Sequence, residues 1–189
     1  MDMRSNAFEI TSMPDPGSRY CKVGRTHCFY FNKDGIPLIT VGPHWPIMCI
    51  TGFLILLITG IFLGYICPKV GKIDLIVGCL IFSITLYFFF AAALVNPGIV
   101  IMSTQMKSRG DFNSSMEKIC TECNVIREDF TEHCKKCRVC VEEYDDHYSL
   151  LGKCVGKNTV KYFYGLLVCA LCMLVFIVTT LFFRFKDKL

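Results

Sequence analysis

Cysteine and histidine are concentrated in one stretch, residues 120–154, which holds six cysteines and two histidines in 35 residues. Thiolate sulfur and imidazole nitrogen are the ligands that a tetrahedral Zn²⁺ prefers, and a Cys-x2-Cys pair presents two of them from one turn. Eight ligands suffice for two four-coordinate ions. The stretch therefore predicts a module folded around two Zn²⁺ ions, in preference to disulfides or free core cysteines.

The spacing of these ligands repeats, with the second set shifted by fourteen positions along the chain. Each set is a Cys-x2-Cys pair, a histidine after nine further residues, and a last cysteine after six more. We therefore assign two interleaved metal sites. The first comprises Cys120, Cys123, His133 and Cys140, and the second comprises Cys134, Cys137, His147 and Cys154.

This pattern resembles the cysteine-rich domain of the DHHC family of membrane protein S-acyltransferases, the palmitoyltransferases. The family pattern C-x2-C-x9-HC-x2-C-x2-CV-x3-DHHC-PW-x-NNCVG aligns with residues 120–156 without a gap. All eight zinc ligands of the family are matched, as are Val141 and the run Cys154-Val155-Gly156. A D-P-G motif that follows the second membrane helix in the family corresponds to Asn96-Pro97-Gly98, with Asn in place of Asp.

The tetrapeptide that names the family is altered in this chain. In the gapless alignment, Asp-His-His-Cys becomes Asp145-Asp146-His147-Tyr148. The resemblance implies that the cysteine is the nucleophile that takes the acyl group from acyl-CoA. It also implies that the first histidine is a general base oriented by the aspartate, and that the second is a zinc ligand. Only Asp145 and the ligand His147 remain.

The replacing residues do not supply the lost chemistry. A tyrosine hydroxyl with a pKa of about 10 gives only about a thousandth part of phenolate at pH 7, and an acyl ester on Tyr148 would not be a transferable thioester. Asp146, with an ordinary carboxyl pKa of about 3.9, is too weak a base to activate a hydroxyl. The gapless alignment therefore predicts a degenerate site without a catalytic residue.

A second register keeps an aspartate, a histidine and a hydroxyl in order. Some family members carry D-H-Y-C, and residues 146–149 would then read D-H-Y-S, with Ser149 in the place of the cysteine. This register needs one extra residue before the tetrapeptide and one fewer after it, and it removes His147 from the second zinc. Gapless spacing is the simpler interpretation, and neither register contains the catalytic thiol.

Three long apolar segments place the chain in a membrane. Residues 47–67, 75–95 and 162–183 carry no charge, and a helix needs about 20 residues to cross the hydrocarbon core. A soluble chain of 189 residues, 53% of them hydrophobic, cannot bury three such helices. The residues before the first span lack the early apolar core of a signal peptide, so we expect that span to be the insertion signal.

The distribution of basic residues predicts the orientation. Residues 1–46 hold five lysines and arginines and residues 96–161 hold ten, whereas the loop between the first two spans holds only two. Basic segments mark the cytosolic side, where thiols also stay reduced and available to metal. Ten acidic residues balance the ten basic ones in the segment 96–161. The segment therefore lacks the excess of positive charge that is typical of a nucleic-acid-binding surface.

The segments that flank the spans carry weaker signals. Residues 1–19 are expected to form a poorly ordered tail and residues 103–118 a polar linker. Residues 28–41 predict a short β-hairpin around the turn Lys33-Asp34-Gly35. We interpret His44 as an interfacial residue rather than a ligand.

Three lysines, Lys153, Lys157 and Lys161, precede the third span. We interpret them as cytosolic anchors of that span. In active relatives, the resemblance implies, basic side chains near the membrane hold the phosphates of acyl-CoA. Residues 124–132 lack the Pro and Arg positions common in the family, although Arg127 retains a basic residue there. This difference weakens the case for acyl-CoA binding, and we assign no cofactor-binding residue.

The sequence thus predicts an α-helical membrane protein with three transmembrane helices, a small cytosolic two-zinc domain between the second and third, and a short N-terminal β-hairpin. The expected divisions are a cytosolic N-terminal segment (1–46), two transmembrane helices (47–98), a DHHC-like zinc-binding domain (99–161), and the third helix with a short tail (162–189).

The functional hypothesis is a catalytically inactive palmitoyltransferase-like protein. It would act as a zinc-stabilised scaffold or accessory subunit in an assembly of the eukaryotic endomembrane, in the ER or Golgi, with membrane lipid and a protein as its partners. The alternative is a residual S-acyltransferase that uses acyl-CoA through Ser149 or another residue. A third possibility is a passive substrate that an active relative acylates.

Overall fold

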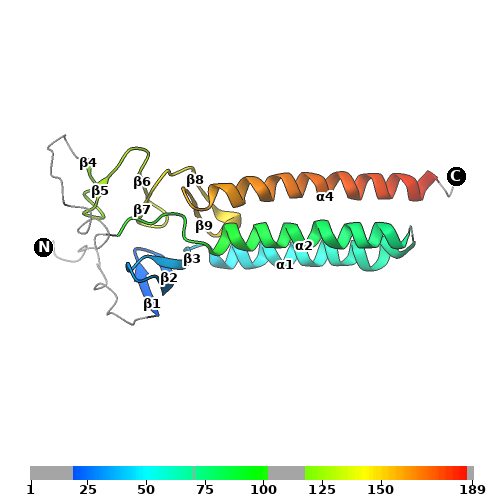
Figure 1. Ribbon diagram of the computed structural model, residues 1–189, viewed down its shortest axis with the longest axis horizontal. Coiled ribbons are helices and arrows are strands. Elements are labelled where there is room, and N and C mark those ends of the chain that lie inside the picture. The colour runs from blue at the N-terminus through cyan, green and yellow to red at the C-terminus, as the bar shows by residue number, and fades with distance from the viewer. Residues whose placement is uncertain (1–18, 70, 102–117, 187–189) are drawn as a thin grey trace, which may run out of the picture.

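The computed structural model describes residues 19–69, 71–101 and 118–186. The predicted tail and the predicted linker lie outside the described residues, apart from residues 19 and 118 at their ends. The helices run side by side at one end of the molecule, and all the strands lie at the other end (Figure 1). The chain is thus divided into a helical part and a strand-rich part.

Among the described residues, three helices are long and apolar enough to cross a membrane, as the sequence predicts. They are Trp45–Lys69, Lys72–Leu94 and Val160–Phe183. The first consists of α1 (Trp45–Ile61), a π-helical turn η1 (Phe62–Ile66) and a 3₁₀ turn η2 (Cys67–Lys69); α2 is Lys72–Leu94, and α4 is Val160–Lys186. Pro46 lies in the first turn of α1, where its missing N–H is tolerated.

Small residues let α2 approach its neighbours closely. A Cβ atom added at Gly165 of α4 would lie 2.5 Å from the Phe88 ring of α2. A Cβ atom at Gly78 of α2 would lie 2.6 Å from Leu63 and 2.9 Å from Phe176. Because lipid is as apolar as these side chains, close packing rather than exclusion from water holds such helices together.

The N-terminal segment forms a three-stranded antiparallel sheet. Its strands are β1 (Tyr20–Val23), β2 (Thr26–Phe31) and β3 (Pro37–Val41), in the order β1-β2-β3. The predicted hairpin corresponds to β2 and β3, and the turn between them places Gly35 at a φ of 77°. Strand β1 was not predicted, because four residues are too short a run to show a pattern in the sequence, although Cys21 and Val23 pack against a buried cluster.

Three two-stranded hairpins build the zinc-binding head. They are formed by β4 (Lys118–Ile119) with β5 (Ile126–Arg127), β6 (Glu132–Cys134) with β7 (Val139–Val141), and β8 (Asp146–Tyr148) with β9 (Lys153–Val155). A 3₁₀ turn, η3 (Ser149–Leu151), connects β8 to β9. The register pairs His133 with Cys140 and His147 with Cys154.

Asn96-Pro97-Gly98 forms the junction between α2 and the head. The helix ends at Leu94, and Oδ1 of Asn96 accepts hydrogen bonds from the amides of Gly98 and Ile99, at 3.1 and 3.0 Å. The side-chain Nδ2 of Asn96 donates to the carbonyl of Pro37 in β3 at 2.9 Å. The predicted end of the helix is confirmed. The Asn96 side chain also connects β3 to the end of α2.

Candidate metal centres and the altered tetrapeptide

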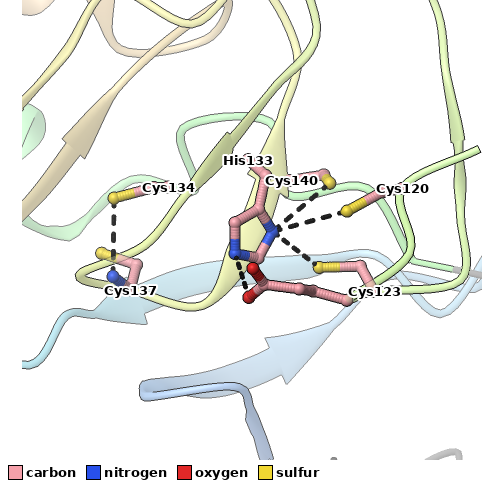
Figure 2. A network of polar contacts seen from close by, with 7 residues as sticks. Cys120, Cys123, His133, Cys134, Cys137 and Cys140 are labelled. Atoms are coloured by element: carbon pink, nitrogen blue, oxygen red, sulfur yellow. Dashed lines mark hydrogen bonds and ion pairs between the residues drawn. The ribbon is translucent and has the colours of Figure 1, made fainter. Parts of the chain in front are cut away.

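The first set of predicted ligands comes together in the head. Nδ1 of His133 lies 3.6 Å from Sγ of Cys120, 3.1 Å from Sγ of Cys123 and 3.8 Å from Sγ of Cys140. Figure 2 shows the three sulfur atoms gathered around this one nitrogen. All four ligand atoms lie within 4.8 Å of one another, so that a single ion can contact them all.

The second set converges in the same way. Nδ1 of His147 lies 3.6 Å from Sγ of Cys134, 3.2 Å from Sγ of Cys137 and 3.6 Å from Sγ of Cys154. All four side chains are buried. Because His147 belongs to this cluster, the structure agrees with the gapless alignment and not with the register that removes His147 from the metal.

These distances suit zinc. With Zn–S of about 2.3 Å and Zn–N of about 2.0 Å, a tetrahedral site separates sulfur from nitrogen by about 3.5 Å. The nitrogen-to-sulfur distances in both clusters, 3.1 to 3.8 Å, bracket that value. Burial lowers the pKa of His147, which keeps its imidazole neutral as a metal ligand must be. The two clusters therefore fit two Zn²⁺ ions, the predicted cofactors.

The fourteen-residue repeat of the sequence is also a repeat of the backbone. Asn124 and Arg138, fourteen positions apart, both adopt left-handed conformations, with φ of 53° and 55°. Their amides donate equivalent hydrogen bonds, from Asn124 to the Cys120 carbonyl at 2.8 Å and from Arg138 to the Cys134 carbonyl at 2.7 Å. Each Cys-x2-Cys pair therefore sits on the same tight turn, which directs both sulfur atoms toward one point.

The two histidine ligands differ in what their outer nitrogens contact. Nε2 of His133 lies 2.9 Å from a carboxylate oxygen of Glu122, within the same head. Nε2 of His147 lies 2.7 Å from Nδ1 of His44, which immediately precedes α1. Sequence reasoning missed this contact of His44, because the two histidines are 103 positions apart and no spacing rule connects them.

Residues 145–148, where the family tetrapeptide aligns, contact one another and the start of α4. The Tyr148 hydroxyl donates to Oδ2 of Asp145 at 3.1 Å, and Oδ1 of Asp146 accepts from the backbone amide of His147 at 2.6 Å. The Tyr148 ring lies against that of Phe163, with centroids 4.3 Å apart. Two effects raise the pKa of Tyr148: partial removal from solvent, and the nearby Asp145 carboxylate. The hydroxyl therefore stays protonated.

Comparison with protein families identifies this part of the chain. Residues 113–188 match the family model described as DHHC palmitoyltransferase. They form a DHHC-family domain. The match covers the zinc-binding head and α4, and it leaves α1, α2 and the N-terminal sheet outside. No curated protein matches the chain.

Among the described residues of the DHHC domain, the Ser149 hydroxyl has no hydrogen bond to a base. It begins η3, and its carbonyl accepts a hydrogen bond from the Gly152 amide at 3.0 Å. The histidine that the second register would use as a base, His147, has one nitrogen in the sulfur cluster and the other against His44. Neither nitrogen is left to receive the proton of a serine hydroxyl.

The interpretation of Lys153 as a surface anchor of the third span is wrong. Its side chain is 1% exposed, and Nζ donates to the carbonyl of Thr40 at 3.3 Å, to Oγ1 of Thr40 at 3.1 Å and to the carbonyl of Val95. Burial lowers its pKa to about 7. Lys153 thus connects the DHHC domain to β3 and to the end of α2, whereas Lys157 lies on the surface and pairs with Glu142 at 2.9 Å.

An acidic groove borders the altered tetrapeptide. Its volume is about 520 Å³, and Asp145 is one of its walls. The lining consists of Glu128, Asp129, Phe130, Thr131, Glu142, Glu143, Tyr144, Asp145, Lys157 and Val160. Five carboxylates face one lysine, which is already paired with Glu142. The groove is therefore unsuited to polyphosphate groups.

Proposed function

We propose that this protein is a catalytically inactive member of the DHHC family that acts as a zinc-stabilised scaffold or accessory subunit in a membrane assembly. The observation that carries the proposal is the identity of residue 148 and the hydrogen bond that its side chain makes. A tyrosine stands at the position of the nucleophilic thiol, and its hydroxyl is hydrogen-bonded to Asp145, the residue that would orient the missing base.

The surroundings of Tyr148 support an inactive site. Asp146 replaces the base, and its carboxylate accepts a hydrogen bond from the His147 amide. The neighbouring groove carries five carboxylates, which repel the phosphates of acyl-CoA. A module whose fold depends on its metals keeps its ligands even where its chemistry is lost, because the zinc ions supply the folding free energy.

An accessory role also agrees with the exposed surface of the first membrane helix, in which Gly60 lies in α1 and Gly64 in η1. Gly60 and Gly64 have nothing within 4 Å of an added Cβ, so the side of the helix that carries them is open to another helix. We infer that a partner protein packs in the membrane beside the three helices, which otherwise contact lipid. We propose a cytosolic position for the head and the N-terminal sheet, which the charge distribution supports. We also propose that the membrane is that of the ER or Golgi.

Labelling with a clickable acyl-CoA tests the loss of activity. We expect the purified zinc-loaded protein to acquire no acyl label, in parallel with an active DHHC enzyme that becomes labelled. A label that hydroxylamine removes would defeat the proposal. A hydroxylamine-resistant label that disappears in Ser149→Ala would instead establish the residual acyltransferase, and a label that forms only when the active enzyme is added would establish a passive substrate.

Purification tests the accessory role. The protein is extracted in mild detergent, and the proteins that travel with it are identified and quantified against an unrelated three-helix membrane protein. We expect one membrane protein in a fixed ratio to the chain. Recovery of the chain alone, under conditions that preserve both zinc ions, would count against an accessory subunit.

A further inference from the structure

His44, the residue before α1, lies at the outer edge of the second zinc cluster. Its Nδ1 is 2.7 Å from Nε2 of His147, and the two rings meet edge to face, with centroids 4.9 Å apart and an interplanar angle of 80°. The other ring nitrogen of His147 faces the three sulfurs of its set. The sulfur cluster, His147 and His44 therefore form one continuous chain of contacts.

The chemistry of a metal-bound imidazole fixes the direction of this hydrogen bond. When Nδ1 of His147 gives its lone pair to zinc, the proton of the neutral ring must lie on Nε2, which then donates. Nδ1 of His44 is the acceptor, so His44 carries its own proton on Nε2. Such an outer hydrogen bond holds a ligating histidine in one tautomer and one orientation.

The backbone holds His44 at this position. Its amide donates to the carbonyl of Gly152 in the β8–β9 connection at 3.2 Å, and its own carbonyl accepts from the amide of Met48 in the first turn of α1 at 3.2 Å. Gly42 makes the approach possible, because an added Cβ there would lie 2.3 Å from the Gly152 carbonyl oxygen. The ring of His44 is thus built into the joint between α1 and the head.

We propose that His44 is a positioning residue for the second zinc site, and that through His147 it ties the start of the first membrane helix to the metal. At the first site, Glu122 occupies the corresponding place and belongs to the DHHC domain itself. The first site is self-contained, whereas the second depends on a residue outside the matched domain. This inference does not rest on the loss of activity.

Site-resolved metal release tests the proposal. The full chain is loaded with zinc in detergent, challenged with a chelator and treated with a thiol-alkylating reagent, and the labelled cysteines are mapped by mass spectrometry. In His44→Ala we expect Cys134, Cys137 and Cys154 to become labelled about 10- to 100-fold faster, with the first set unchanged. Glu122→Ala is the matched control, and we expect it to accelerate only Cys120, Cys123 and Cys140.

Two further variants separate the hydrogen bond from packing. His44→Asn retains an acceptor, its Oδ1, near the place of Nδ1, and we expect it to restore most of the protection of the second set. His44→Phe retains the ring but not the acceptor, and we expect it to behave like His44→Ala. If His44→Ala does not fold, as judged by circular dichroism, the Asn and Phe variants decide the question by themselves. Equal labelling of these two variants, or a wild-type rate in His44→Ala, would overturn the proposal.

Discussion

The hydroxyl of Tyr148 donates a 3.1 Å hydrogen bond to the carboxylate of Asp145. In the family pattern these two positions hold the nucleophile and the residue that orients its base. Here Tyr148 and Asp145 are hydrogen-bonded to each other. The Tyr148 ring lies against Phe163 at the start of α4. The position that holds the nucleophile in the family pattern is here a contact between the zinc-binding head and the third membrane helix.

Substitution of Tyr148 separates the ring contact from the hydrogen bond. Tyr148→Phe keeps the ring and removes a partly exposed hydrogen bond, so we expect a loss of at most about 1 kcal/mol in unfolding free energy. Tyr148→Ala also removes the contact with Phe163, and we expect a further loss of about 1 kcal/mol or more. Thermal unfolding in detergent checks this order. A Phe variant as unstable as the Ala variant would contradict it.

Removal of zinc is expected to unfold the head and leave the helices. Structural zinc supplies about 10 to 16 kcal/mol in small metal-folded modules, and the hairpins that carry the ligands are only two or three residues per strand. We expect a strong chelator to extract two zinc ions per chain, measured by a zinc-sensitive dye, while circular dichroism retains most of its helical signal. Extraction of a single ion, or an unchanged head, would speak against two structural sites.

Loss of the Lys153 ammonium is expected to loosen the joint between the head and the helices. Lys153→Met keeps the length of the side chain but leaves the carbonyls of Thr40 and Val95 without their donor. Each buried polar group that loses its partner costs about 1 to 3 kcal/mol. We expect a clearly lower melting temperature in detergent. Lys157→Met, which removes a surface ion pair instead, serves as the control and should change it little.

Close packing of α2 and α4 predicts an asymmetry between two glycines. Gly165→Ala places a methyl group within 3 Å of three atoms of the Phe88 ring, and such overpacking costs about 1 to 3 kcal/mol. Gly60→Ala meets nothing within 4 Å, and Ala is the better helix former, so that this variant should be neutral or slightly stabilised. Thermal unfolding of the two variants compares them directly, and equal losses would disprove the described packing.

The parts of the structure that follow local rules were predictable from the sequence. The ligand sets of both metal sites follow from spacing, because each Cys-x2-Cys turn brings its own pair together. The three spans follow from the length of their apolar runs. The stop after α2 follows from Pro97, which disfavours helix at the residue before it.

The contacts of His44 and Lys153 were not predictable in this way. His44 reaches His147, and Lys153 reaches Thr40, across 103 and 113 positions of the chain. Such contacts depend on how the head sits on the helices, which no local pattern encodes. A lysine before a membrane span is ordinarily an exposed anchor, and only the fold shows that this one lies buried among carbonyl oxygens.

Interleaving of the metal sites has a consequence for how this protein can evolve. His133 and Cys134 are consecutive residues that serve different ions, so no cut in the chain separates one complete ligand set from the other. Neither metal site can be deleted, duplicated or exchanged as one continuous segment without affecting the other. One codon can change the residue at position 148, but the deletion of a segment that contains one complete ligand set also removes part of the other.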